Sequence, residues 1–129
     1  MKITRFEELN IWKLSLKITK SIYDLTSKKE FIREFGLKDQ IRRAVISISS
    51  NIVEGFEKNN NNEFIRYLKI AKGSVGELRN QLYICKDVNF ISQKEFKDLN
   101  KDLETLASQI GAFIFYLSKK RLNKEFINK

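Results

Sequence analysis

The chain contains no histidine among its 129 residues. This absence excludes histidine general bases, Ser-His and Cys-His nucleophile pairs, and histidine zinc sites. It also excludes the Glu-x-x-His pairs with which di-iron four-helix bundles hold metal. The close glycines, Gly73 and Gly76, lack the Lys-Ser/Thr of a phosphate-binding P-loop. We therefore expect no enzymatic activity, no cofactor and no metal.

Proline is also absent, and there are only five glycines, which suits long uninterrupted helices. The sequence has no 18-residue apolar run, and its polar start, MKITRFEELN, lacks the apolar core of a secretory signal. The one cysteine, Cys85, falls on an apolar helix face and is expected to be a buried small hydrophobe rather than a reactive thiol. These features predict a single cytoplasmic domain spanning residues 1–129.

Basic residues outnumber acidic residues by 25 to 16, which gives a formal net charge of +9. A basic surface attracts phosphate backbones and releases their counterions on binding. The abundance of lysine, asparagine and isoleucine is, however, also expected from an AT-rich genome. Charge alone therefore leaves nucleic-acid binding and simple solubility open.

Four segments repeat apolar residues at intervals of three and four, the spacing of amphipathic helices. The expected helices span about residues 7–27, 37–57, 62–88 and 92–120. The KNNNN connection is too short for anything but an antiparallel turn. We expect Asn61 or Asn62 to cap the third helix, and Ser92 with Glu95 to form a capping box on the fourth. The sequence thus predicts an all-α, antiparallel, up-down-up-down four-helix bundle.

The longest connection, KKEFIREFG at residues 28–36, interrupts this periodicity. Its apolar residues Phe31, Ile32 and Phe35 are expected to fold over the end of the bundle. Gly36 would permit a sharp entry into the second helix.

The second and third helices form a hairpin in which residue numbers that sum to about 120 lie at the same height. Arg43 then lies level with Glu77, and Glu54 with Arg66. Such pairs fix register between neighbouring helices, or cross a subunit boundary. The expected structural or interface polar residues are Arg43, Asn51, Glu54 and Glu77; an active-site cluster is the disfavoured alternative.

The same hairpin places Ser47 beside Gly73. A glycine inside a helix costs about 1 kcal/mol relative to alanine. Gly73 and Gly76 near small residues therefore predict an unusually close approach of another backbone, although glycines tolerated on an exposed face remain the alternative.

Cations follow one side of the expected third helix. Lys72, Arg79 and Lys86 recur every seven residues and form a line of roughly 20 Å. Arg42 points away from Ile41 and is expected to join them. Few aromatic residues interleave, so we expect phosphate contacts with little reading of bases. The candidate nucleic-acid-binding residues are Arg42, Arg66, Lys69, Lys72, Arg79 and Lys86; a merely solvated face is the alternative.

The run QIRRAVISISSNIVEGF, followed by EFIRYLKIAKGSVGEL, resembles the family of 23S rRNA intervening-sequence proteins, often called four-helix bundle proteins. The resemblance extends to FEELNIWKLSLKI and to FGL at 35–37, so it covers about nine-tenths of the chain. It implies a small four-helix bundle that assembles as a homopentamer and has no enzyme activity. A related branch, the accessory variability protein of diversity-generating retroelements, binds nucleic acid and works beside a reverse transcriptase.

Two functions follow as expectations. The first is a non-catalytic homo-oligomer, a pentamer by resemblance, that binds nucleic acid through its basic surface, with RNA favoured and an RNA–DNA hybrid as the other candidate. The alternative is a protein–protein adaptor or assembly factor, for example an accessory subunit of a retroelement reverse transcriptase. Its charge would then serve only solubility or steering.

Overall fold

The structure is a computed structural model that describes residues 3–122, with side chains as far as Lys120. The two terminal segments of the predicted 1–129 domain, residues 1–2 and 123–129, therefore lie outside the described residues. Within the described part, every regular element is helical. The α-helices are α1 (Asn10–Leu25), α2 (Phe35–Glu57), α3 (Asn61–Asp87) and α4 (Gln93–Leu122), with short 3₁₀ turns η1 (Phe6–Glu8) and η2 (Lys29–Phe31).

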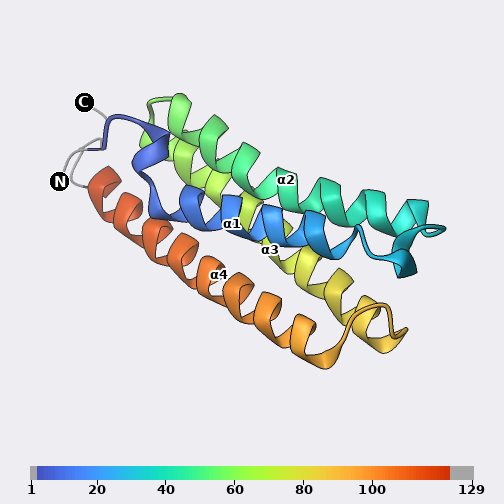
Figure 1. Ribbon diagram of the computed structural model, residues 1–129. Coiled ribbons are helices and arrows are strands. Elements are labelled where there is room, and N and C mark those ends of the chain that lie inside the picture. Colours follow the sequence, from blue (N-terminus) through green and yellow to red (C-terminus); the bar gives the residue numbers. More distant parts are fainter. Residues whose placement is uncertain (1–2, 123–129) are drawn as a thin grey trace.

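The four α-helices lie side by side, and consecutive helices run in opposite directions (Figure 1). Each helix packs against its neighbours in sequence, and α1 closes the bundle by packing against α4. The helices α1 and α3 therefore lie diagonally opposite one another. This arrangement confirms the predicted up-down-up-down four-helix bundle.

The core contains the stripes that the spacing predicts. On α3, Leu68, Ala71, Leu78, Leu82 and Cys85 are fully buried. The same holds on the other helices for the positions that repeat at three and four, including Ile18, Ile22, Ile41, Ile52, Leu103, Leu106 and Ile110. Burial of such a side chain contributes roughly 1.5–3 kcal/mol, which makes this core the main stabilising feature of the fold.

The starts of the helices are only partly as predicted. The first segment begins with the turn η1, and α1 proper starts at Asn10, later than expected. Neither Asn61 nor Asn62 caps α3; the side chain of Asn60 instead accepts a hydrogen bond of 3.0 Å from the backbone N–H of Glu63. The left-handed Asn59 (φ 56°) completes the turn within fewer residues, so α3 begins earlier than expected.

The predicted capping box of α4 is confirmed. The N–H of Glu95 donates to the Ser92 hydroxyl (3.0 Å), and the N–H of Ser92 donates to the Glu95 carboxylate (2.8 Å). Lys28 also binds that carboxylate at 2.8 Å, so the cap ties the end of α1 to the start of α4. Both bonds favour the ionised form and lower the pKa of Glu95.

The connection between α1 and α2 differs from the prediction. Phe31 is buried and meets Phe90 edge-on at 5.5 Å, but Ile32 and Phe35 are 62% and 75% exposed. Because α2 already begins at Phe35, Gly36 is a helical residue and does not form a sharp turn. Its small size is not needed for the chain to enter this helix.

The predicted register of α2 and α3 is confirmed to within one residue, because Ser47 and Ser74 share a 2.9 Å hydrogen bond between their hydroxyl oxygens. The predicted close approach at Gly73 and Gly76 is wrong. A Cβ atom added at either glycine would meet nothing within 4 Å, since both positions are exposed. The close approach occurs at Gly55, where an added Cβ would lie 2.6 Å from the Cβ of Tyr67.

Candidate nucleic-acid interface

The six cations predicted to bind nucleic acid do not form one surface. Lys72, Arg79 and Lys86 face the groove between α3 and α4, because each of them approaches a residue of α4. Arg42 instead faces α1. The predicted line of cations is therefore present along α3, but the four-helix packing separates it from the cation on α2.

The hollow in the α3–α4 groove is lined by Lys69, Lys72, Gly73, Gly111 and Ile114, and its volume is about 470 Å³. The side chain of Lys72 lies against Gly111: a Cβ atom added there would be in van der Waals contact with the Lys72 ammonium nitrogen, at 3.7 Å. Both lysine side chains are exposed, and neither forms an ion pair or hydrogen bond with any described residue. We call this feature the lysine hollow; its ammonium groups can bind phosphate without first breaking a protein contact.

Two further cations of the line are already engaged. Arg79 donates to the side chain of Asn100 (2.9 Å) and to the carboxylate of Glu104 (3.1 Å), and so links α3 to α4. The ammonium group of Lys86 lies 4.7 Å from the centre of the Phe96 ring. A phosphate at either residue would compete with these contacts, so the lysine hollow is the most accessible part of the line.

The other two candidates also have protein partners. Arg42 donates to the Thr26 hydroxyl (2.9 Å) and lies over the Tyr23 ring at 4.2 Å, so it fastens α2 to the end of α1. The prediction that Arg42 joins the cations of α3 is therefore wrong, because the packing of α1 against α2 captures its side chain. Arg66 pairs with Glu63 (3.0 Å) on the exposed surface of α3.

The predicted pairs between α2 and α3 are also absent. Arg43 bonds Asp39 (2.8 Å) rather than Glu77, and Arg66 bonds Glu63 rather than Glu54. Exposed side chains reach a partner one turn away on the same helix more easily than one across a seam. These bonds raise the pKa of both arginines, but such exposed pairs contribute little to stability.

The four predicted polar residues nevertheless share one face of the molecule. Positions 43, 47, 51 and 54 follow one side of α2, and positions 70, 74, 77, 81, 84 and 88 follow one side of α3. Asn51 donates to the Ser47 hydroxyl (3.0 Å), which bonds Ser74 and so joins the two lines. We call this face the α2–α3 surface; its residues are Arg43, Ser47, Asn51 and Glu54 on α2 and Ile70, Ser74, Glu77, Gln81, Ile84 and Val88 on α3.

The α2–α3 surface exposes several apolar side chains. Ile70, Ile84 and Val88 are 43%, 44% and 49% exposed along one side of α3, with Glu77 between Ile70 and Ile84. Beside them Gln81 is buried, and its side-chain oxygen has no hydrogen-bond partner among the described residues. An apolar line with an unsatisfied acceptor beside it is typical of a surface that contacts another protein chain.

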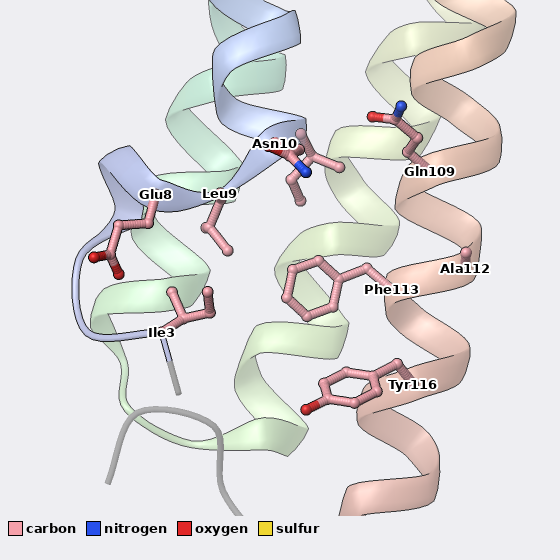
Figure 2. Close-up of a pocket in the computed structure, with 9 residues that line it drawn as sticks. Ile3, Glu8, Leu9, Asn10, Gln109, Ala112, Phe113 and Tyr116 are labelled. Carbon is pink, nitrogen blue, oxygen red and sulfur yellow. The ribbon is translucent and has the colours of Figure 1, made fainter. Parts of the chain in front are cut away.

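A larger cavity, of about 540 Å³, lies between the N-terminal segment, α1 and α4 (Figure 2). Figure 2 shows the Phe113 ring at its centre, with Asn10 and Gln109 on one side and Tyr116 on the other. Sequence reasoning did not find this cavity or the lysine hollow. Both depend on where α4 lies against α3 and α1, and the periodicity of a single helix does not specify that position.

The thiol of Cys85 is buried in the core, as predicted. Burial disfavours the thiolate and raises the pKa of Cys85 to about 11. Because the folded-state value exceeds that of the unfolded chain, this burial stabilises the fold fully below about pH 9, and the contribution is lost as the pH rises towards 11. The thiol is therefore neutral and unreactive at neutral pH.

Within the described residues, no group of three or more acidic or cysteine side chains is placed to hold a metal ion. Nor is any helix in residues 3–122 both long and apolar enough to cross a membrane.

Comparison with known proteins agrees with the resemblance noted in the sequence. A family model described as "23S rRNA-intervening sequence protein" matches residues 7–112, which is most of the chain. The chain belongs to the 23S rRNA-intervening sequence protein family. The match covers both the lysine hollow up to Gly111 and the whole of the α2–α3 surface.

A solved structure supports the fold assignment independently. A protein of unknown function from the S23 ribosomal protein family of Bacteroides thetaiotaomicron superimposes with a TM-score of 0.74 at 24% sequence identity. The alignment covers 81% of this chain and 94% of that one. At this identity the likeness concerns the fold. No curated protein matches the chain.

Proposed function

We propose that this member of the 23S rRNA-intervening sequence protein family is a non-catalytic, homo-oligomeric protein that binds nucleic acid, with RNA as the favoured ligand. The observation that carries the RNA proposal is the lysine hollow. Its two ammonium groups have no partner in the described part of a chain with net charge +9. Phosphate oxygens are the acceptors that such a pair binds best.

RNA is favoured because the family takes its name from 23S rRNA. The groups in the lysine hollow are cationic, and a point charge contacts phosphates without reading sequence. A structured fragment of 23S rRNA is therefore the natural first ligand, and an RNA–DNA hybrid of the same length is the comparison.

The homo-oligomer proposal is supported by the α2–α3 surface. Self-association would remove Ile70, Ile84 and Val88 from water and could bring a donor to Gln81. Glu54 and Glu77 form no ion pair among the described residues and would find cations on a neighbouring basic chain. The pentamer expected from the family resemblance is the specific form of this proposal. We also propose a cytoplasmic location, where the protein would meet its RNA.

Light-scattering mass tests both parts at once. We expect the free protein to have a mass near five times the 15.2 kDa of one chain. With a 23S rRNA fragment at low salt, the mass should increase by that of the RNA. A monomer in all conditions would contradict assembly, and an oligomer whose mass never changes with RNA would contradict RNA binding.

Replacement of Ile70 and Ile84 by glutamate is expected to reduce the oligomer to monomers, because each contact of the ring would have to bury two new charges without partners. The matched control replaces Leu16 and Ile32, which are 42% and 62% exposed elsewhere on the molecule. Light scattering should give the wild-type mass for the control. An unchanged mass for the Ile70/Ile84 variant would show that another surface holds the oligomer together.

A second function, a protein–protein adaptor, is favoured by the same apolar line on α3. A partner such as a reverse transcriptase would then cover Ile70, Ile84 and Val88 in place of a second copy. A purified monomer that assembles only when such a partner is added, and that ignores RNA, would favour this alternative.

A further inference from the structure

The cavity shown in Figure 2 is built from fixed parts. Leu9 and Ile11, which are 2% and 3% exposed, form its floor. The Phe113 ring is held edge-on between Phe64 (5.4 Å) and Tyr116 (5.9 Å between ring centres). A volume of about 540 Å³ lies within the range of small-molecule sites.

The N-terminal wall of this cavity is also held in place. The Glu8 carboxylate accepts hydrogen bonds from the backbone N–H groups of Thr4 (3.0 Å) and Arg5 (3.3 Å). These bonds hold the segment before α1 in a turn that packs against α1 and α2, and Ile3 of this segment lines the cavity. The cavity therefore exists before any ligand arrives, which limits the entropy cost of binding.

Two amide side chains without hydrogen-bond partners in the described part of the chain lie at the rim of the cavity. The side chains of Asn10 and Gln109 are exposed and form no hydrogen bond with the described residues. They lie at the same height on facing helices, in the register that the contact between Lys17 and Asp102 (3.7 Å) also shows. Each amide offers both a donor and an acceptor, the combination that reads the edge of a nucleobase.

Charge determines which part of a ligand can enter. The lining residues include one carboxylate, Glu8, and no cation, so a phosphate is repelled from the interior. The interior therefore suits a flat neutral ring, and an attached phosphate would stay outside the cavity.

We propose that this cavity receives one unpaired base of a single-stranded RNA. The base packs against the aromatic side chains of Phe113 and Tyr116, and the amides of Asn10 and Gln109 bind its edge. This inference rests on the proposed RNA binding and extends it from the lysine hollow to the opposite side of α4. A helix is about 10–12 Å across with its side chains, so one strand can cross α4 and occupy both sites.

The test fills the cavity from an exposed position. Ala112 lines it but is solvent-exposed, so Ala112→Trp blocks the space without a change in the core. Gln109→Leu removes one rim amide with little change in volume. Ser108→Trp is the matched control, because Ser108 is exposed on α4 and does not line the cavity. Each variant is titrated with an unstructured single-stranded RNA of about 12 nucleotides and with the same RNA in a duplex.

We expect Ala112→Trp to weaken binding of the single strand about tenfold, the loss expected for one stacked base. Gln109→Leu should weaken it less, the duplex affinity should stay constant, and Ser108→Trp should resemble the wild type. Single-strand affinity unchanged in both Ala112→Trp and Gln109→Leu would overturn the proposal.

Photocross-linking distinguishes the base-binding cavity from RNA binding in general. Single-stranded RNA carrying 5-iodouridine should photocross-link to Phe113 or Tyr116, as mapped by mass spectrometry. If the wild type binds RNA but cross-links only elsewhere, for example at Tyr83, the base site is wrong and RNA binding stands. If the wild type binds neither single-stranded nor duplex RNA, both proposals fail.

Discussion

Reversal of the two charges in the lysine hollow is expected to lower RNA affinity about a hundredfold or more. Lys69→Glu with Lys72→Glu removes two charge-assisted contacts, each worth about 1.5–3 kcal/mol, and sets two carboxylates against the phosphates. A factor of ten in affinity corresponds to about 1.4 kcal/mol, so the loss of both contacts exceeds two orders of magnitude. Fluorescence anisotropy with a labelled 23S rRNA fragment measures this directly.

The control for net charge is Lys13→Glu with Lys29→Glu, which reverses the same number of exposed lysines on α1 and η2. Circular dichroism and light-scattering mass should be unchanged in both variants. Arg79 is left intact because its contacts with Asn100 and Glu104 join α3 to α4, and a glutamate there would face another carboxylate. Equal RNA affinity in the two variants would contradict the assignment of the hollow.

The largest expected effect on stability comes from Gly55→Ala. The new Cβ would lie 2.6 Å from the Cβ of Tyr67 and 3.4 Å from the backbone of Phe64, so α2 and α3 must move apart. Overpacking of this kind costs roughly 1–3 kcal/mol. Thermal denaturation should show a midpoint several degrees below that of the wild type.

The matched control is Gly76→Ala, because an added Cβ there meets nothing within 4 Å on an exposed helix face. That substitution should stabilise the protein by up to about 1 kcal/mol, since alanine favours the helix. If both variants melt at the same temperature as the wild type, the inference that α2 and α3 approach closely at Gly55 is wrong.

The fold followed from the sequence because one physical pattern repeats throughout it. Apolar residues at intervals of three and four specified the buried side of each helix, and the short KNNNN connection forced α2 and α3 into an antiparallel hairpin. The hydrogen bond between Ser47 and Ser74 shows that this also predicted the register. The capping box of Ser92 and Glu95 followed from local chemistry alone.

The candidate nucleic-acid interface was less predictable because an exposed side chain can form an ion pair or hydrogen bond with any of several neighbours. Arg42 lies on the outer side of α2 in the sequence pattern, yet α1 captures it through Thr26 and Tyr23. Arg43 was expected to reach Glu77 across the seam and instead pairs with Asp39. Differences between such surface partners amount to a few tenths of a kcal/mol, which sequence spacing does not resolve.

Glycines gave the least reliable signal. Gly73 and Gly76 suggested close packing because two helical glycines occur together, but both are exposed, and an added Cβ at either would meet nothing within 4 Å. Gly55 is the one of these three glycines that lies at a tight contact. It is the next-to-last residue of the NIVEGF run, and its local sequence does not indicate that role. Only the crossing of α2 and α3 distinguishes them.

The measurement that tests the central claim most directly is the salt dependence of RNA binding by the wild-type protein. Affinity for a 23S rRNA fragment, determined between about 50 and 200 mM salt, should fall linearly on a logarithmic plot as counterions are released. For the Lys69/Lys72 variant, the plot of log affinity against log salt should be less steep, by the amount expected for the loss of two phosphate contacts. An affinity that is independent of salt, or an absence of binding at the lowest salt, would contradict an RNA-binding role for the lysine hollow.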